Sequence, residues 1–161
     1  MTGIRAIALD VDGVLTDGGV WWGPGGQEWK RFSYADIMGV SLGMKAGLVF
    51  ALVSGEDSPL VDRFAFKMGI SHVEKSCKDK ANAMRRFSDK TAIPLSATAY
   101  MGNDVNDLGA MQLAGLAAAT ADALPAVKRV AAFVSSRAGG HGAVREFIDA
   151  LLAAKTVEAE T

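Results

Sequence analysis

Short apolar runs recur along the chain, separated by segments in which apolar residues return every three or four positions. The runs are rich in β-branched and aromatic residues or alanine and end in polar or turn residues, which is typical of buried strands. The expected strands are residues 4–10, 48–54, 97–102, 115–120 and 131–135, with a weaker strand at 71–74.

The segments between these runs have the spacing of amphipathic helices. The expected helices are residues 36–46, 58–68, 78–90, 106–113, 123–129 and 142–154. Strands that alternate with helices predict an α/β fold with a doubly wound, mainly parallel sheet that helices cover on both faces. We expect this Rossmann-like fold to form one domain over residues 1–154, followed by a disordered polar tail at 155–161.

A protruding β-hairpin is expected at about residues 20–32, with Gly23-Pro24-Gly25-Gly26 as its turn. All three tryptophans of the chain, Trp21, Trp22 and Trp29, lie in this hairpin. Because adjacent strand residues face opposite sides, Trp21 and Trp22 cannot both reach the core of their own domain. An exposed aromatic patch favours a contact between subunits.

Composition narrows the possible partners. The 161 residues carry a formal net charge of −1, which gives no reason to expect nucleic acid or an anionic membrane as a partner. The single cysteine, Cys77, excludes a disulfide framework and a cysteine-rich zinc site. The N-terminus lacks the pattern of a signal peptide, and no apolar run approaches the roughly 18 residues of a membrane span. We therefore expect a soluble, cytoplasmic protein.

Polar residues follow three of the expected strands, and Lys80 opens a helix after the weak one. The residues are Asp10 and Asp12 after the first strand, Ser54 and Gly55 after the second, and Asn103, Asp104 and Asp107 after 97–102. Taken singly, such residues are ordinary turn or helix-capping residues. In a parallel sheet, however, these strand ends meet at one edge, which is where ligands bind.

Several acidic groups at one edge would repel one another unless a cation with oxygen ligands, such as Mg²⁺, lay between them. A hydroxyl, a backbone amide and a lysine beside that cation would complement a phosphate, which points to phosphoryl transfer. Asp10 can then act as a nucleophile and Asp12, two residues on, as an acid and base. A calcium loop is disfavoured, because the bidentate glutamate at its twelfth position is missing.

These motifs resemble a known family. The segment DVDGVLTDG (10–18) is similar to the first motif of the haloacid dehalogenase-like phosphatases, and Ser54, Lys80 and GNDVND (102–107) match the other three in order and spacing. The hairpin and AGGHGAVREF (138–147) resemble the small branch without a cap domain. That branch includes phosphatases of 3-deoxy-manno-octulosonate 8-phosphate and of nine-carbon sialic-acid-like sugars. The resemblance covers about residues 4–152.

The resemblance implies a Mg²⁺-dependent phosphatase. It implies that Asp10 is the nucleophile and Asp12 the acid and base, while Ser54, Gly55 and Lys80 hold the phosphate. The metal would take Asp10, the Asp12 backbone carbonyl and Asn103, with Asp104 and Asp107 beside it or as alternative ligands. Candidate substrate contacts are Glu56, Asp36, Lys67, Arg137 and His141.

Three departures from the family pattern bear on the substrate and the metal. Asn103 stands where the family usually has aspartate, and Glu56 where the octulosonate enzymes usually have arginine. Arginine is also common in those enzymes at the position of Ala35. The lost arginines favour a nine-carbon keto-sugar acid phosphate. In the capless relatives, a tetramer forms through the hairpin, and a glycine-rich segment like 137–144 helps to cover the site of a neighbouring subunit.

We therefore expect hydrolysis of a 2-keto-3-deoxy sugar acid phosphate, of the nine-carbon type, through an aspartyl-phosphate intermediate in a homotetramer. One alternative is a 3-deoxy-manno-octulosonate 8-phosphate phosphatase. An alternative of another class is a weakly active oligomerisation module associated with a sialic acid cytidylyltransferase. Asn103 favours that module, and the intact residues of the other motifs oppose it.

Overall fold

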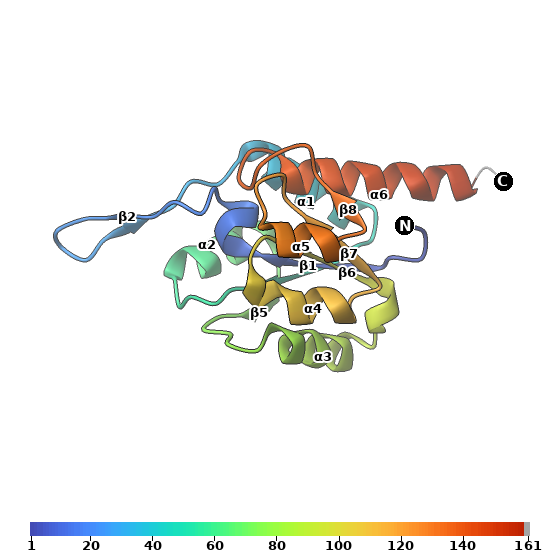
Figure 1. The fold of residues 1–161 in the computed structure, drawn as a ribbon, viewed down its shortest axis with the longest axis horizontal. Coiled ribbons are helices and arrows are strands. Elements are labelled where there is room, and N and C mark those ends of the chain that lie inside the picture. The colour runs from blue at the N-terminus through green and yellow to red at the C-terminus, as the bar shows by residue number, and fades with distance from the viewer. Residues whose placement is uncertain (160–161) are drawn as a thin grey trace.

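A six-stranded parallel sheet forms the centre of the computed structural model, which describes residues 1–159 (Figure 1). Its strands lie in the order β5-β4-β1-β6-β7-β8, and every neighbouring pair is parallel. The strands are β1 (Ala6–Asp10), β4 (Val49–Val53), β5 (His72–Glu74), β6 (Thr98–Gly102), β7 (Leu116–Ala119) and β8 (Phe133–Val134). The predicted α/β fold with a parallel sheet is confirmed.

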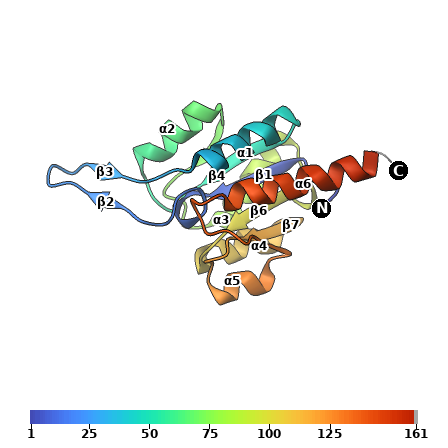
Figure 2. The same cartoon turned by 90° about the horizontal axis from the view of Figure 1, so that it is seen from above.

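Helices cover both faces of this sheet (Figures 1 and 2). One face packs against α1 (Tyr34–Lys45), α2 (Pro59–Met68) and α6 (Ala143–Ala159). The other packs against α3 (Lys80–Thr91), α4 (Leu108–Leu113) and α5 (Pro125–Val130). Within β1, Ile7 and Leu9 join the first core while Ala6 and Ala8 join the second. The central strand is therefore buried on both sides, which explains its continuous apolar sequence.

The last helix extends further than the sequence predicted. α6 continues to Ala159, so residues 155–159 are helical and the expected disordered tail is wrong for them. Residues 160 and 161 of that tail lie outside the described residues. No helix within residues 1–159 is long and apolar enough to cross a membrane.

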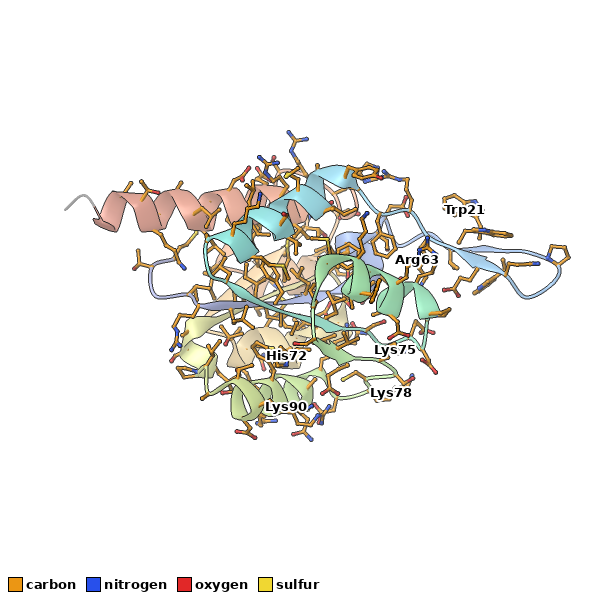
Figure 3. The ribbon with its side chains drawn as sticks, turned by 180° about the vertical axis from the view of Figure 1, so that it is seen from behind. Trp21, Arg63, His72, Lys75, Lys78 and Lys90 are labelled. Carbon is orange, nitrogen blue, oxygen red and sulfur yellow. The ribbon has the colours of Figure 1, made fainter. Side chains whose placement is uncertain are left out.

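The predicted hairpin is confirmed and projects from one end of the domain (Figures 1 and 2). It pairs β2 (Trp21–Trp22) with β3 (Glu28–Trp29) in antiparallel register. The exposed fractions of Trp21, Trp22 and Trp29 are 57%, 76% and 53%. Figure 3 shows Trp21 on the hairpin, clear of the sheet and its helices. None of the three tryptophans therefore contributes to the core of this chain.

One buried hydroxyl has no hydrogen-bond partner among residues 1–159. It belongs to Thr120, which follows β7 and is fully buried. Thr98, equally buried at the start of β6, donates its hydroxyl to the carbonyl of Pro94 at 3.1 Å. On burial both hydroxyl groups lose their hydrogen bonds to water, and only that of Thr98 gains one within the described residues.

We expect Thr120→Val to raise the free energy of unfolding by about 1 kcal/mol. The valine side chain has nearly the same shape as that of threonine but lacks the unpaired buried hydroxyl group. The matched variant Thr98→Val should lower the free energy of unfolding by about 1 kcal/mol, since it removes the hydrogen bond from the Thr98 hydroxyl to the Pro94 carbonyl. Denaturant unfolding followed by circular dichroism would measure both. Equal losses in the two variants would contradict the difference.

Candidate active site

The polar strand ends meet in a cavity of about 160 Å³ at the carboxyl edge of the sheet. Parallel strands bring this about, because Asp10 at the end of β1 lies beside Val53 of β4, and β6 flanks β1 on the other side. The cavity is lined by Asp10, Asp12, Gly55, Glu56, Lys80, Asn103, Asp104 and Asn106. The structure therefore brings together residues from all four motifs that the sequence singled out.

Lys80 is the centre of a buried ion-pair network. Its Nζ lies 2.8 Å from Asp10 Oδ1 and 2.7 Å from Asp107 Oδ1. Lys80 starts α3, whereas Asp10 ends β1 and Asp107 lies in the single turn of 3₁₀ helix after β6. All three side chains are almost completely excluded from solvent. The ammonium group thus connects three separate segments behind the cavity.

Asp107 accepts four hydrogen bonds, counting the one from Lys80. Its Oδ1 also accepts from the Tyr100 hydroxyl at 2.7 Å. Its Oδ2 accepts from the backbone N–H groups of Asn103 and Asp104, at 2.9 and 3.1 Å. Asp107 therefore orients Lys80 and shapes the fourth-motif loop, and its oxygen atoms face these donors instead of the cavity.

The burial of these groups changes their acidity. Burial, with the charge of Asp107, raises the pKa of Asp10 to about 7 against the opposing charge of Lys80. Burial alone would lower the pKa of Lys80, but the charges of Asp10 and Asp107 hold it above its usual value. Burial also raises the pKa of the Tyr100 phenol well above its usual value, so that it remains a donor to Asp107.

Glycine is required at position 13, where the chain turns after the first motif. Its backbone has φ +85°, and a Cβ there would lie 2.2 Å from Asn103 Nδ2. The Thr16 hydroxyl accepts from the N–H groups of Gly13 and Gly18, both at 3.2 Å. This turn places the carbonyl of Asp12 next to the side chain of Asn103.

Three oxygen atoms converge at that point. The side-chain oxygen of Asn103 lies 3.1 Å from both Asp10 Oδ2 and the carbonyl oxygen of Asp12, and it faces only acceptors. Such an arrangement is repulsive by itself, whereas adjacent oxygen ligands of an octahedral Mg²⁺ ion lie about 3 Å apart. The donor set fits a hard cation. In a cation-free protein the amide would turn over, because its NH₂ group could then donate to both oxygens.

This donor set is not a cluster of acidic side chains. Among residues 1–159, no group of three or more His, Cys, Asp or Glu side chains is placed to hold a metal. The site combines one carboxylate, one amide and one backbone carbonyl. Asp104, the alternative ligand, lines the same cavity, but its Oδ1 accepts from the N–H of Val105 at 2.6 Å. The geometry favours Asn103 as the ligand.

The second-motif serine faces its own loop. The Ser54 hydroxyl accepts from the N–H of Glu56 at 3.1 Å, donates to the Glu56 carbonyl at 3.2 Å, and is fully buried. It is absent from the cavity lining, which Gly55 and Glu56 form at this point. In this conformation Ser54 shapes the loop, and Gly55 presents its backbone to the cavity.

A lysine that the sequence did not single out reaches the site from the hairpin. Lys30 Nζ lies 2.8 Å from Asp12 Oδ1, and the Lys30 side chain is only 5% exposed. Burial would lower the pKa of Lys30, but its contacts with Asp12 and Glu28 hold it above the usual value. Glu28 lies on β3 and Lys30 directly follows it, so these residues, two positions apart in extended backbone, share a face. The spacing of Glu28 and Lys30 was the only sequence signal for the contact between Lys30 and the site.

Asp36, predicted as a substrate contact, has a structural role instead. Its carboxylate is buried and accepts from the backbone N–H groups of Gly142 and Arg145, at 3.1 and 3.0 Å. These groups belong to the first turn of α6 and the residue before it, where N–H groups lack partners within the helix. Within this chain Asp36 caps α6 and is absent from the lining of the cavity around Asp10, so its predicted substrate contact is corrected to this capping role.

His141 does not point into the cavity of its own chain either. Its Nε2 accepts from Arg31 Nη2 at 2.8 Å, and its Nδ1 lies 2.8 Å from the Gly139 carbonyl. The glycine-rich segment packs on the first-motif loop, since Gly140 N–H donates to the Val14 carbonyl at 2.9 Å. A Cβ on Gly139 would lie 1.9 Å from the carbonyl oxygen of Gly13. Within this chain the segment therefore supports the first-motif loop.

The remaining substrate candidates lie in other cavities. Lys67 lines a cavity of about 200 Å³ that also contains Lys30 and Arg63. Arg137 lines one of about 430 Å³ together with Arg145 and Asp149. Within one chain, only Glu56 of the predicted substrate contacts borders the cavity that contains Asp10.

Comparison with known proteins gives consistent results. The sequence model of a family described as haloacid dehalogenase-like hydrolases matches residues 50–148. The chain is 38% identical to the 3-deoxy-D-manno-octulosonate 8-phosphate phosphatase KdsC of Escherichia coli K12 over 152 residues, which is 94% of this chain and 81% of that protein.

Two solved structures are similar over nearly the whole chain. One is the 3-deoxy-D-manno-octulosonate 8-phosphate phosphatase of Moraxella catarrhalis in complex with magnesium, phosphate and KDO. It has a TM-score of 0.93 and 34% identity over 96% of this chain and 88% of that one. The other is the cobalt-bound deoxy-D-mannose-octulosonate 8-phosphate phosphatase of Haemophilus influenzae, with a TM-score of 0.93 and 35% identity over 96% and 90%.

Proposed function

The chain belongs to the haloacid dehalogenase-like hydrolase family and is a phosphatase, and from this premise we propose that it hydrolyses 3-deoxy-D-manno-octulosonate 8-phosphate with Mg²⁺. The observation that carries the proposal is the convergence of Asp10, Asp12, Lys80 and Asn103 in one cavity. The names of the relatives support the eight-carbon sugar acid as the substrate.

Asp10, Asn103 and the Asp12 carbonyl would hold Mg²⁺, which neutralises charge between the Asp10 carboxylate and the phosphate dianion. Asp10 attacks phosphorus, and the bond from phosphorus to the sugar oxygen breaks. Asp12 gives a proton to that oxygen. Asp12 then takes a proton from the water molecule that attacks the aspartyl phosphate, which releases phosphate and restores Asp10. Lys80 offsets negative charge beside the reacting group throughout.

A second candidate is a nine-carbon keto-sugar acid 9-phosphate. The relatives do not support this preference. One observation favours it: Glu56 borders both the cavity around Asp10 and a second cavity of about 350 Å³ under the hairpin. The octulosonate enzymes that the sequence resembles usually carry arginine there. A carboxylate would accept hydrogen bonds from the hydroxyl groups of a longer sugar.

We expect the wild type to release phosphate from the eight-carbon substrate with kcat/KM at least about tenfold above that for the nine-carbon one. Asp10→Asn should lower turnover of both by at least about 1000-fold, because an amide is a poor nucleophile. Asp89→Asn, an exposed change on α3, is the control. A preference for the nine-carbon ester would establish the second candidate, and full activity of Asp10→Asn would refute the mechanism.

The metal ligand can be tested separately. We expect Asn103→Ala to weaken Mg²⁺ binding at least about tenfold in isothermal titration calorimetry, because it removes one oxygen ligand. Asp104→Ala should change the affinity by less than about threefold, since that carboxylate is engaged with Val105. A larger loss in Asp104→Ala than in Asn103→Ala would assign the ligand to Asp104.

We also propose that the protein assembles as a homotetramer through the hairpin, in the cytoplasm. Three exposed tryptophans on a two-stranded ribbon support an interface, because such a ribbon has little stability alone. We expect light scattering to give a mass near four times the 16.8 kDa of one chain. The double variant Trp21→Ser, Trp29→Ser should lower that mass, and a monomeric wild type would contradict the proposal.

A further inference from the structure

Lys30 enters the site from a segment that lies outside the four motifs. It follows β3 on the returning side of the hairpin, and its side chain is almost completely buried. Its Nζ lies 2.8 Å from Asp12 Oδ1 and 3.5 Å from Glu28 Oε1. A lysine that gives up its hydration in this way is held in one place by its two carboxylate partners.

Glu28 connects this lysine to the body of the domain. Its Oε1 accepts from the Ser58 hydroxyl at 2.7 Å, and its Oε2 accepts from Trp22 Nε1 at 3.3 Å. Ser58 is buried and caps the first turn of α2. A continuous set of contacts therefore runs from α2 through Glu28 and Lys30 to Asp12.

Asp12 stands between two cavities. One is the cavity around Asp10, and the other, of about 350 Å³, lies against the hairpin and contains Trp22, Glu28 and Lys30. Both cavities include Asp12 and Glu56. A phosphate ester bound at Asp10 has room for its sugar in the hairpin cavity. The oxygen that must receive a proton would then lie at the boundary that Asp12 occupies.

The Asp12 carboxylate needs such support. Its side chain is 31% exposed, and no hydrogen bond within residues 1–159 other than that of Lys30 holds it. A general acid must lie within about 2.6–3.2 Å of the atom that it protonates. A displacement of about 1 Å can cost a factor of 100 in rate.

We infer that Lys30 is a positioning residue, which holds the Asp12 carboxylate at the boundary between the two cavities so that it can reach the leaving oxygen. The inference rests on the proposed phosphatase mechanism. The end of the hairpin that joins the domain, where Lys30 lies, then takes part in catalysis. The side chain acts through Asp12, and its effect should therefore depend on how much the leaving group needs a proton.

The test compares two esters by kcat/KM, which reports the steps up to release of the first product. Aryl release from p-nitrophenyl phosphate needs no proton, whereas the sugar alkoxide of 3-deoxy-octulosonate 8-phosphate does. We expect Lys30→Met to lower kcat/KM about 30-fold for the sugar ester and less than about threefold for the aryl ester. Lys45→Met, an exposed change at the end of α1, should alter neither.

A double-mutant cycle completes the test. In an Asp12→Asn background, Lys30→Met should cause no further loss with the sugar ester. Equal losses with both esters, or a full loss that persists in that background, would overturn the inference. If Lys30→Met still lowers kcat/KM in the Asp12→Asn background, and raises KM for the sugar ester but not for the aryl ester, Lys30 binds the sugar acid directly.

Thermal unfolding shows whether Lys30→Met remains folded, and Met keeps most of the buried volume of lysine. If the variant unfolds, Glu28→Gln provides the second test, because it removes the negative charge that Glu28 places beside Lys30. It should give the same dependence on leaving group. A wild type that hydrolyses neither ester would refute the proposed function, and the role of Lys30 with it.

Discussion

The active-site region depends on one buried ammonium group. Lys80 joins two carboxylates that would otherwise repel each other at the carboxyl ends of β1 and β6. Removal of a charge from water is costly unless partners replace its hydration, and here Asp10 and Asp107 do so at 2.8 and 2.7 Å. Asp107 is in turn held by four donors, which leaves it little freedom to move. Asp10 is thereby aimed at the cavity before any ligand binds.

The charge balance of the site explains why neutral Asn103 is compatible with its position. Asp10 and Asp107 carry two negative charges against the single positive charge of Lys80. An aspartate at 103 would add a third carboxylate within 3.1 Å of Asp10. The pKa of Asp10, already raised to about 7 by burial and by Asp107, would rise further. As the proposed metal ligand, asparagine would supply an oxygen atom without that repulsion.

The strands, helices and motif residues could be predicted because they depend on local pattern. β1 is buried on both faces, so it reads as an apolar run, and it ends where Asp10 meets the cavity. The roles of Asp36 and His141 were not predictable in this way. Each has a partner more than a hundred residues away in the chain, in the first turn of α6 and in the hairpin respectively. The burial of Ser54 was hidden for a similar reason, since its loop conformation decides where the hydroxyl points.

By itself, the sequence determined the alternation of elements, the edge of the sheet where the site forms, and most of the residues that line it. These follow from periodicity and from the rule that parallel strands end together. The tertiary structure alone decided which oxygen atoms converge on Asn103 and which carboxylate caps a helix. It also decided that Lys30 contacts Asp12. These contacts join segments that are distant along the chain, and only the packing of the hairpin, α2 and α6 on the sheet brings them within hydrogen-bond distance.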